Sequence, residues 1–257
     1  MSFVAVLTRV FLVICSFFIL SSAKARDWAV IEKSGVIHAA TEGVFPPFNY
    51  VENKKLTGLE VELAEAIAKK LGVKMKWNTM AFDALIPAAK SDRVDFVISG
   101  HAYTEDRAKV VDFANPHVCS GAQIIGKKGN LLTAQSLAGK QIAVQMSTSY
   151  FDEAKKIKDI RGIKTYRSDP DALEALLEGK ADAWISDKWL AKLQIDQHPS
   201  AMLASGEQLS EERLSILLKK NNPLLLSKIN QALAELTKEG FLLSLSQKYL
   251  HGDATCK

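Results

Sequence analysis

Hydrophobic and polar positions follow two alternating patterns along the chain, one typical of strands and one of helices. Residues 36–41 (VIHAAT) predict a short strand, and residues 42–55, with two prolines and several polar turn residues, predict a loop. In residues 59–71 the apolar positions recur with the spacing of one helix face. Glutamates come early in this segment and lysines late, as the helix dipole favours, and Gly72 follows as a candidate C-cap.

The same alternation continues downstream. Strands are predicted at 73–80 and 94–99, and helical segments at 82–91 and from 104. A repeated strand–helix order indicates a parallel sheet covered by helices. Ligands of such sheets bind beyond the carboxyl ends of the strands. Three polar segments follow predicted strands or lie at their ends: 41–45, 79–83 and 99–107.

A second unit of the same kind begins near residue 121. Its segment ALEALLEGKADAWISD (172–187) repeats the order of LIPAAKSDRVDFVISG (85–100): a helix, a basic turn, a strand with a small residue and an aspartate, and a polar end. The chain therefore predicts two similar α/β lobes. Residues 224–250 form the last long helical pattern, which is amphipathic.

The N-terminal segment has the features of an export signal. Residues 10–20 form an apolar run too short to span a membrane comfortably, and Ala23-Lys24-Ala25 supplies an A-x-A cleavage pattern. We expect residues 1–25 to be a signal peptide cleaved after Ala25, which places the mature protein in the periplasm. The alternative is an uncleaved membrane anchor.

Composition and charge exclude several functions. The chain is 47% hydrophobic and 24% charged, which is an ordinary globular composition. Without residues 1–25 it keeps 31 basic and 29 acidic residues and has no basic run interleaved with aromatics, so no nucleic-acid partner is expected. Cys119 and Cys256 remain after processing. They can form a disulfide in an oxidising compartment, or stay as one buried and one exposed thiol. No metal-ligand spacing is present, and no cofactor is expected.

Seven segments together resemble a known family. They occur in order over residues 35–250, and the set resembles the periplasmic amino-acid-binding proteins of ABC importers, the type II solute-binding family. The resemblance implies an α/β fold of two lobes, each a mostly parallel sheet flanked by helices, with two hinge crossovers. Lobe 1 would comprise residues 26–118 and 210–257, and lobe 2 residues 120–209. The segments are TEGVFPPFNY, GLEVELAEAIAKKLG, FDALIPAAKSDRVDFVISG, TEDRAKVVDFANP, SLAGKQIAVQMSTS, ALLEGKADAWISD and INQALAELTKEG.

The resemblance also assigns groups that bind the ligand's α-carbon substituents. Arg107 matches the arginine that binds the α-carboxylate, a role suited to a guanidinium because it can donate two parallel hydrogen bonds. Thr148 matches a residue near the same carboxylate, and Asp187 matches an acid that binds the α-ammonium. The alternatives are a solvated arginine on a helix surface and two helix-capping residues.

Other positions would contact the ligand's side chain. Phe45 and Phe82 match two aromatic residues that sandwich it in relatives, although a phenylalanine is more often part of a core. Glu42 matches an acidic position that meets the distal charge of basic amino acids, and a glutamate there is also compatible with neutral polar ligands.

The segment SGHAY (99–103) departs from the family pattern. Ala102 stands where relatives carry a serine or threonine whose hydroxyl contacts the ligand. Ser99 and Gly100 still offer hydroxyl or backbone groups. His101 occupies a position that is commonly apolar; it either contacts the ligand or has its ring turned away from the cleft.

These features predict a receptor that binds one free amino acid, basic or polar, between two lobes. The resemblance implies that it is a monomer and delivers the ligand to an inner-membrane ABC permease. One alternative is a periplasmic dehydratase-like enzyme with Glu42 or His101 as acid or base. No nucleophile–histidine–acid set is apparent, so no enzymatic activity is expected. A second alternative is a ligand-sensing subunit for a membrane receptor.

Overall fold

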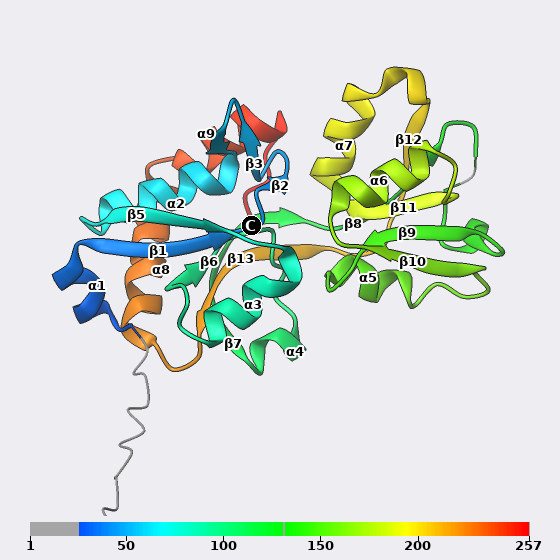
Figure 1. Cartoon of the computed structure of the whole chain (residues 1–257). Coiled ribbons are helices and arrows are strands. Elements are labelled where there is room, and N and C mark those ends of the chain that lie inside the picture. The colour runs from blue at the N-terminus through cyan, green and yellow to red at the C-terminus, as the bar shows by residue number, and fades with distance from the viewer. Residues whose placement is uncertain (1–25, 131, 257) are drawn as a thin grey trace, which may run out of the picture.

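The computed structural model describes residues 26–130 and 132–256. The segment 1–25, predicted as a signal peptide, lies outside the described residues, and its cleavage stays a prediction. The described chain forms two lobes joined by extended strands (Figure 1). Each lobe is built around one five-stranded sheet with helices packed on it.

The sheet of lobe 1 contains strands from both ends of the chain. Its order is β5 (Lys74–Thr79), β1 (Val36–Thr41), β6 (Phe96–Val97), β13 (Glu212–Lys219) and β7 (Val111–Ser120). β1 pairs in parallel with β5 and β6, whereas β13 is antiparallel to β6 and β7. The helices of this lobe are α1 (Trp28–Ser34), α2 (Leu59–Lys70), α3 (Phe82–Lys90), α4 (Glu105–Ala108), α8 (Pro223–Lys238) and α9 (Phe241–Leu250).

Lobe 2 repeats this plan with the middle of the chain. Its sheet order is β10 (Gly162–Tyr166), β9 (Gln141–Gln145), β11 (Ala183–Asp187), β8 (Ala122–Lys127) and β12 (Leu203–Gln208). β9 is parallel to β10 and β11, and β8 is antiparallel to β11 and β12. Its helices are α5 (Ser149–Ala154), α6 (Asp169–Leu177) and α7 (Lys188–Gln197), with two 3-10 turns at Gln135–Leu137 and Pro199–Ala201.

The predicted two-lobed α/β architecture is confirmed, with one refinement. Both sheets are mixed, because the strands that run between the lobes add antiparallel pairs to a parallel core. One crossover runs from β7 to β8 through Gly121, and the other from β12 to β13. Both are visible between the two lobes in Figure 1.

Two local predictions differ from the structure, and one helix was not predicted. The predicted loop 42–55 contains strands of a small antiparallel sheet, β2 (Val44–Phe45), β3 (Asn49–Glu52) and β4 (Lys55–Thr57). The last helical pattern is two helices, because Gly240 adopts a left-handed conformation (φ 75°) between α8 and α9. Helix α1 precedes the first predicted element.

The C-terminal tail is fixed to the first crossover. Cys119, near the end of β7, forms a disulfide with Cys256, so of the two alternatives left open by the sequence the structure has the disulfide. The Cys119 N–H also donates to the Ala254 carbonyl (2.8 Å). From lobe 2, the Trp189 indole donates to the Cys119 carbonyl (3.1 Å). The tail is therefore held against the end of β7, at the residue that Trp189 of lobe 2 also contacts. Within the described ranges no helix is long and apolar enough to cross a membrane.

Candidate functional site

A small cavity, with a free volume of only about 10 Å³, lies between the lobes. Lobe 1 contributes the loops after β1 and β6 and the start of α3, while lobe 2 contributes the end of β9 and the loop that leads into α5. Within each lobe, these segments lie at the carboxyl ends of the parallel strands, where such sheets bind ligands. The lining residues are Glu42, Phe45, Phe82, Ser99, Gly100, Gln145, Thr148, Ser149 and Tyr150, so the cavity gathers six of the residues predicted to bind ligand.

Two hydrogen bonds close the lobes over this cavity. Gln145 of lobe 2 donates through Nε2 to Glu42 Oε1 of lobe 1 (2.7 Å). Arg107 of lobe 1 donates through Nη2 to the Ser147 carbonyl of lobe 2 (3.0 Å). The structure is thus a closed arrangement in which groups predicted to hold ligand contact the opposite lobe instead.

Glu42 is a buried carboxyl group at the centre of the lobe contact. It is 8% exposed, and its backbone N–H donates to Ser99 Oγ (3.0 Å). Burial raises the pKa of Glu42 to about 8, with a further increase from the negative charge of Asp169 and a partial offset from the Gln145 hydrogen bond. The cavity therefore holds a carboxyl group that is mainly neutral near pH 7 and would gain from a cation.

This raised pKa predicts a pH effect on stability. The ionised form is disfavoured in the folded protein, so stability present below the ordinary pKa of 4.5 is lost as pH rises toward 8. We expect Glu42→Gln, which keeps an acceptor for Gln145, to remove this loss. Wild type should weaken relative to the variant by about 1.4 kcal/mol per pH unit within this window. Chemical denaturation at pH 5.5, 6.5 and 7.5 measures the difference, and parallel pH curves would contradict the prediction.

Arg107 is turned into the cleft. Its backbone N–H is capped by Thr104 Oγ1 (3.2 Å), and its Nη1 donates to the Ala102 carbonyl (2.9 Å). The guanidinium carbon lies 5.8 Å from the Phe82 ring centroid. Burial lowers the pKa of Arg107 from its usual value. The guanidinium therefore has carbonyl partners in a partly dry cleft, where an incoming carboxylate would be a stronger acceptor.

Asp187 does not line the cavity. It is fully buried, and its Oδ1 caps α7 by accepting from the N–H groups of Trp189 and Leu190. Its Oδ2 accepts from the hydroxyls of Ser120 and Tyr150. Burial raises the pKa of Asp187, and these hydrogen bonds oppose the increase. Asp187 therefore has the helix-capping role that was the alternative to ligand binding. Its link to the cavity is the hydrogen bond from Tyr150, which lines the cavity.

His101 lies behind Phe82 and is not among the residues that line the cavity. The two rings stack with centroids 4.4 Å apart and an interplanar angle of 13°. Burial, and then the charge of Arg107, lower the pKa of His101 well below its usual value. A neutral ring in this position covers one face of Phe82, so only the other face can contact a ligand. The alternative in which His101 turns away from the ligand fits this geometry.

The aromatic wall from lobe 1 depends on a glycine. Phe45 is buried and stacks on Phe48, with centroids 5.2 Å apart. Gly100 has φ +62°, and a Cβ added there would lie 2.9 Å from the Phe45 ring. Both the left-handed backbone and the close ring exclude a larger residue.

Several residues at the site were not predicted from the sequence. Gln145, Ser149 and Tyr150 line the cavity and flank Thr148 in one loop, so the position of Thr148 was the signal that could have found them. The Thr148 hydroxyl itself holds that loop by donating to the Gln145 carbonyl (2.8 Å). Glu212 belongs to the hinge strand, and burial raises its pKa to about 7. No sequence pattern marks Glu212.

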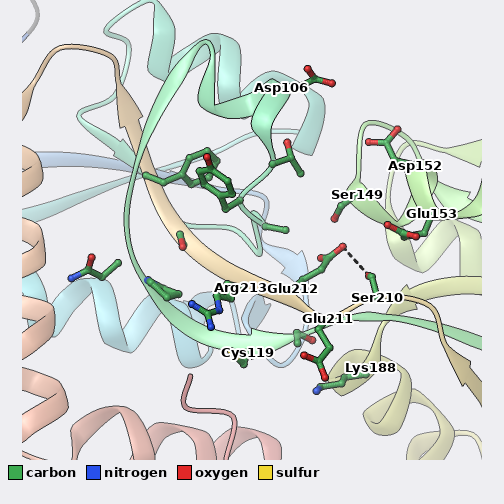
Figure 2. A pocket seen from close by; sticks show the side chains of 18 of the residues that line it. Asp106, Cys119, Ser149, Asp152, Glu153, Lys188, Ser210, Glu211, Glu212 and Arg213 are labelled. Carbon is green, nitrogen blue, oxygen red and sulfur yellow. Dashed lines mark hydrogen bonds between the residues drawn. The ribbon is translucent and has the colours of Figure 1, made fainter. Parts of the chain in front are cut away.

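A wider groove continues from Ser149 along the hinge strands. Figure 2 shows Asp152 and Glu153 on the α5 side of this groove and Glu212 on β13, with Ser210 close to Glu212. Across the part of the chain that the structure describes, no three histidine, cysteine or acidic residues are grouped so as to hold a metal ion.

Comparison with known proteins identifies the family. The model of "Bacterial extracellular solute-binding proteins, family 3" matches residues 37–252. The chain belongs to this family. It is 33% identical over 229 residues to the L-cystine-binding protein TcyJ of Escherichia coli (strain K12), covering 88% of this chain and 86% of TcyJ.

Solved structures agree with this assignment. An ancestral arginine-binding protein bound to arginine superposes with a TM-score of 0.80 at 37% identity, covering 84% of this chain and 98% of that one. An ancestral arginine-binding protein bound to glutamine gives a TM-score of 0.80 at 36% identity, with 85% and 99% covered. The family resemblance and the fold predicted from the sequence are confirmed. The prediction of a binding protein rather than an enzyme is confirmed by these relatives, all of which are named binding proteins.

Proposed function

We propose that this protein is an amino-acid receptor of an ABC importer and that it binds a free amino acid with a basic side chain, such as L-arginine. The observation that carries the proposal is the buried Glu42 carboxyl, which lies in one interlobe cavity with Phe45 and Phe82. A buried carboxylate needs a paired cation, and flat apolar rings suit an aliphatic stem or a guanidinium plane.

The geometry supports a division of roles around the ligand. Arg107 binds the α-carboxylate in place of the carbonyls of Ala102 and Ser147. The α-ammonium lies toward Asp187 and its hydrogen-bonded neighbour Tyr150. Because the groups come from both lobes, a ligand that contacts both favours the closed state. Residues 26–118 with 210–257, and 120–209, are the two bodies that close.

Relatives support the ligand class and define its nearest competitors. The ancestral arginine-binding proteins are bound to arginine and to glutamine, and TcyJ is named for L-cystine. Glu42 favours the basic ligand because only a cationic side chain would pair with the ionised carboxylate; with a neutral ligand the carboxyl group stays protonated near pH 7 and forms no ion pair. Glutamine and cystine are the alternatives that the test includes.

The test is calorimetric titration with L-arginine, L-lysine, L-histidine, L-glutamine and L-cystine. We expect arginine to bind most tightly, and Glu42→Gln to weaken arginine about 10- to 100-fold while changing glutamine less than threefold. Glu207→Gln, at a surface hydrogen bond to Ala134, is the matched control and should leave both unchanged. Equal losses for arginine and glutamine, or wild-type binding to none of the five, would refute the proposal.

Proton linkage gives an independent check on Glu42. A cationic ligand stabilises the ionised carboxylate, so binding near pH 7 should release a proton because the ligand-free pKa is about 8. The affinity for arginine should therefore increase from pH 6 to pH 8. Titrations in buffers of different ionisation enthalpy measure the proton, and Glu42→Gln should abolish its release.

We also propose the cellular setting. The protein is exported to the periplasm, cleaved after Ala25, and delivers its ligand as a monomer to an inner-membrane permease. N-terminal sequencing of the exported chain tests export and cleavage, and its mass in solution tests the monomeric state. Ligand-dependent stimulation of a reconstituted permease tests delivery, whereas stimulation of a sensor kinase alone would favour the sensing alternative.

A further inference from the structure

We propose that Glu60 is a positioning residue for ligand binding: it holds two ligand-facing loops of lobe 1 in place against the hinge strand β7. Glu60 is the second residue of α2, is fully buried, and is not among the residues that line the cavity. The proposal deepens the proposed function and rests on it for its binding readout.

Three separate segments donate hydrogen bonds to this one carboxylate. Asn49 Nδ2 donates to Oε2 (2.8 Å). The Gly100 N–H donates to both oxygens, Oε1 (2.9 Å) and Oε2 (3.1 Å). His117 Nε2 lies 2.9 Å from Oε1. The donors come from β3, the loop after β6 and the hinge strand β7, so one carboxylate joins three segments.

Two of these contacts lead to the cavity, one directly and one through a neighbouring residue. Gly100 lines it, and its left-handed backbone lies under the Phe45 ring. Asn49 links Glu60 to the loop that carries Glu42: the Asn49 Oδ1 accepts a hydrogen bond from the N–H of Gly43, the residue after Glu42 (2.9 Å). Glu60 thereby fixes the backbone on both sides of the lobe 1 wall that would contact the ligand.

The third contact leads to the hinge. His117 is 2% exposed and lies on β7, two residues before the disulfide-bonded Cys119. Because a carboxylate only accepts, His117 must carry its proton on Nε2 to bond Glu60. The ring then ties the strand that enters lobe 2 to the same carboxylate that holds the loops.

The chemistry requires a carboxylate at this position. The groups that face Glu60 from Asn49, Gly100 and His117 are all N–H donors, and the orientation of Asn49 is fixed by Gly43. Glu60→Gln has nearly the same shape but places an NH₂ group against at least one of these donors. The binding loops should then lose their fixed positions although the volume of the core is unchanged.

Asp95 provides a matched control in the same lobe. It is also a buried carboxylate that accepts a backbone N–H, from His38 (2.7 Å), and pairs with Arg26 (3.2 Å). Neither partner lines the cavity. Asp95→Asn should therefore lower the melting temperature without changing ligand binding, which separates loss of stability from loss of positioning.

The experiment measures L-arginine affinity, melting temperature and backbone amide exchange for both variants. We expect Glu60→Gln to bind arginine at least tenfold more weakly and to exchange at Gly43 and Gly100 at least tenfold faster without ligand. Asp95→Asn should keep its affinity within twofold and exchange normally at both glycines. A Glu60→Gln protein with wild-type affinity, or with unchanged exchange at the two glycines, would overturn the proposal.

His117→Phe covers the case in which Glu60→Gln does not fold. It keeps a ring of similar size and removes one donor, so arginine affinity should fall about threefold or more, with faster exchange at Gly100. Wild-type values for both would also overturn the proposal. If the wild-type protein binds no amino acid, the proposed function fails, but the exchange measurement still decides whether Glu60 positions the loops.

Discussion

Replacing Arg107 with methionine is expected to weaken L-arginine binding by about 100- to 1000-fold. The guanidinium is the cation aimed into the cleft beside the cavity, and its present partners are two backbone carbonyls. A ligand carboxylate would form two charge-assisted hydrogen bonds there, each worth about 1.5–3 kcal/mol. Methionine keeps an unbranched stem that can pack on Phe82 but donates no hydrogen bond.

Two further variants make the result specific. Arg107→Lys keeps the charge without the planar fork and should lose less, about tenfold. Arg213→Met, in the wider groove, removes an arginine near the hinge and should change affinity less than threefold. Calorimetric titration measures all three. If Arg107→Met bound arginine within threefold of wild type, the α-carboxylate would have to lie elsewhere.

The position of the site was predictable because it depends on strand order. The parallel core of lobe 1 brings the carboxyl ends of β1 and β6 to one edge of its sheet, so Glu42, Ser99 and nearby residues could be expected to meet from sequence alone. Gly100 was predictable for the same reason. The pattern of apolar positions carries this information, since it fixes which segments are strands.

Side-chain orientation was not predictable in the same way. His101 and Phe82 lie on different elements, and only the packed structure shows that their rings stack and that the histidine lies behind the wall. Asp187 ends its predicted strand, yet its carboxylate accepts hydrogen bonds from Ser120 and Tyr150 rather than facing the cavity. Such details depend on tertiary contacts between residues far apart in the chain, which periodicity does not encode.

The buried polar groups of the fold show the same limit. Glu60 has the position of an ordinary residue in an amphipathic helix, and its sequence neighbours do not reveal its three donors. Glu212 is likewise an unremarked acid until the hinge strand brings it near Arg107. Long-range hydrogen bonds of this kind explain why the predicted site omitted residues that the structure places at its edge.

Removal of the disulfide is the second change with a large expected effect. Cys119 and Cys256 are 137 residues apart in the sequence, so their bond closes a loop that spans all of lobe 2. Restricting a loop of this length in the unfolded chain stabilises the folded state by about 5 kcal/mol in the chain-entropy account. The variant Cys119→Ser/Cys256→Ser should therefore have a free energy of unfolding lower by roughly that amount and a melting temperature lower by roughly 10 °C.

Binding should respond differently from stability. The bond lies at the end of β7 beside the tail, and neither cysteine lines the interlobe cavity, so arginine affinity should stay within threefold. Reduced wild type is the matched control. It should have the same melting temperature as the double serine variant, and reductant should not change the melting temperature of the variant. Equal melting of oxidised wild type and the variant would contradict the stability effect. A large loss of affinity would instead show that the Cys119 tether, with the Trp189 hydrogen bond to its carbonyl, sets how far the lobes close.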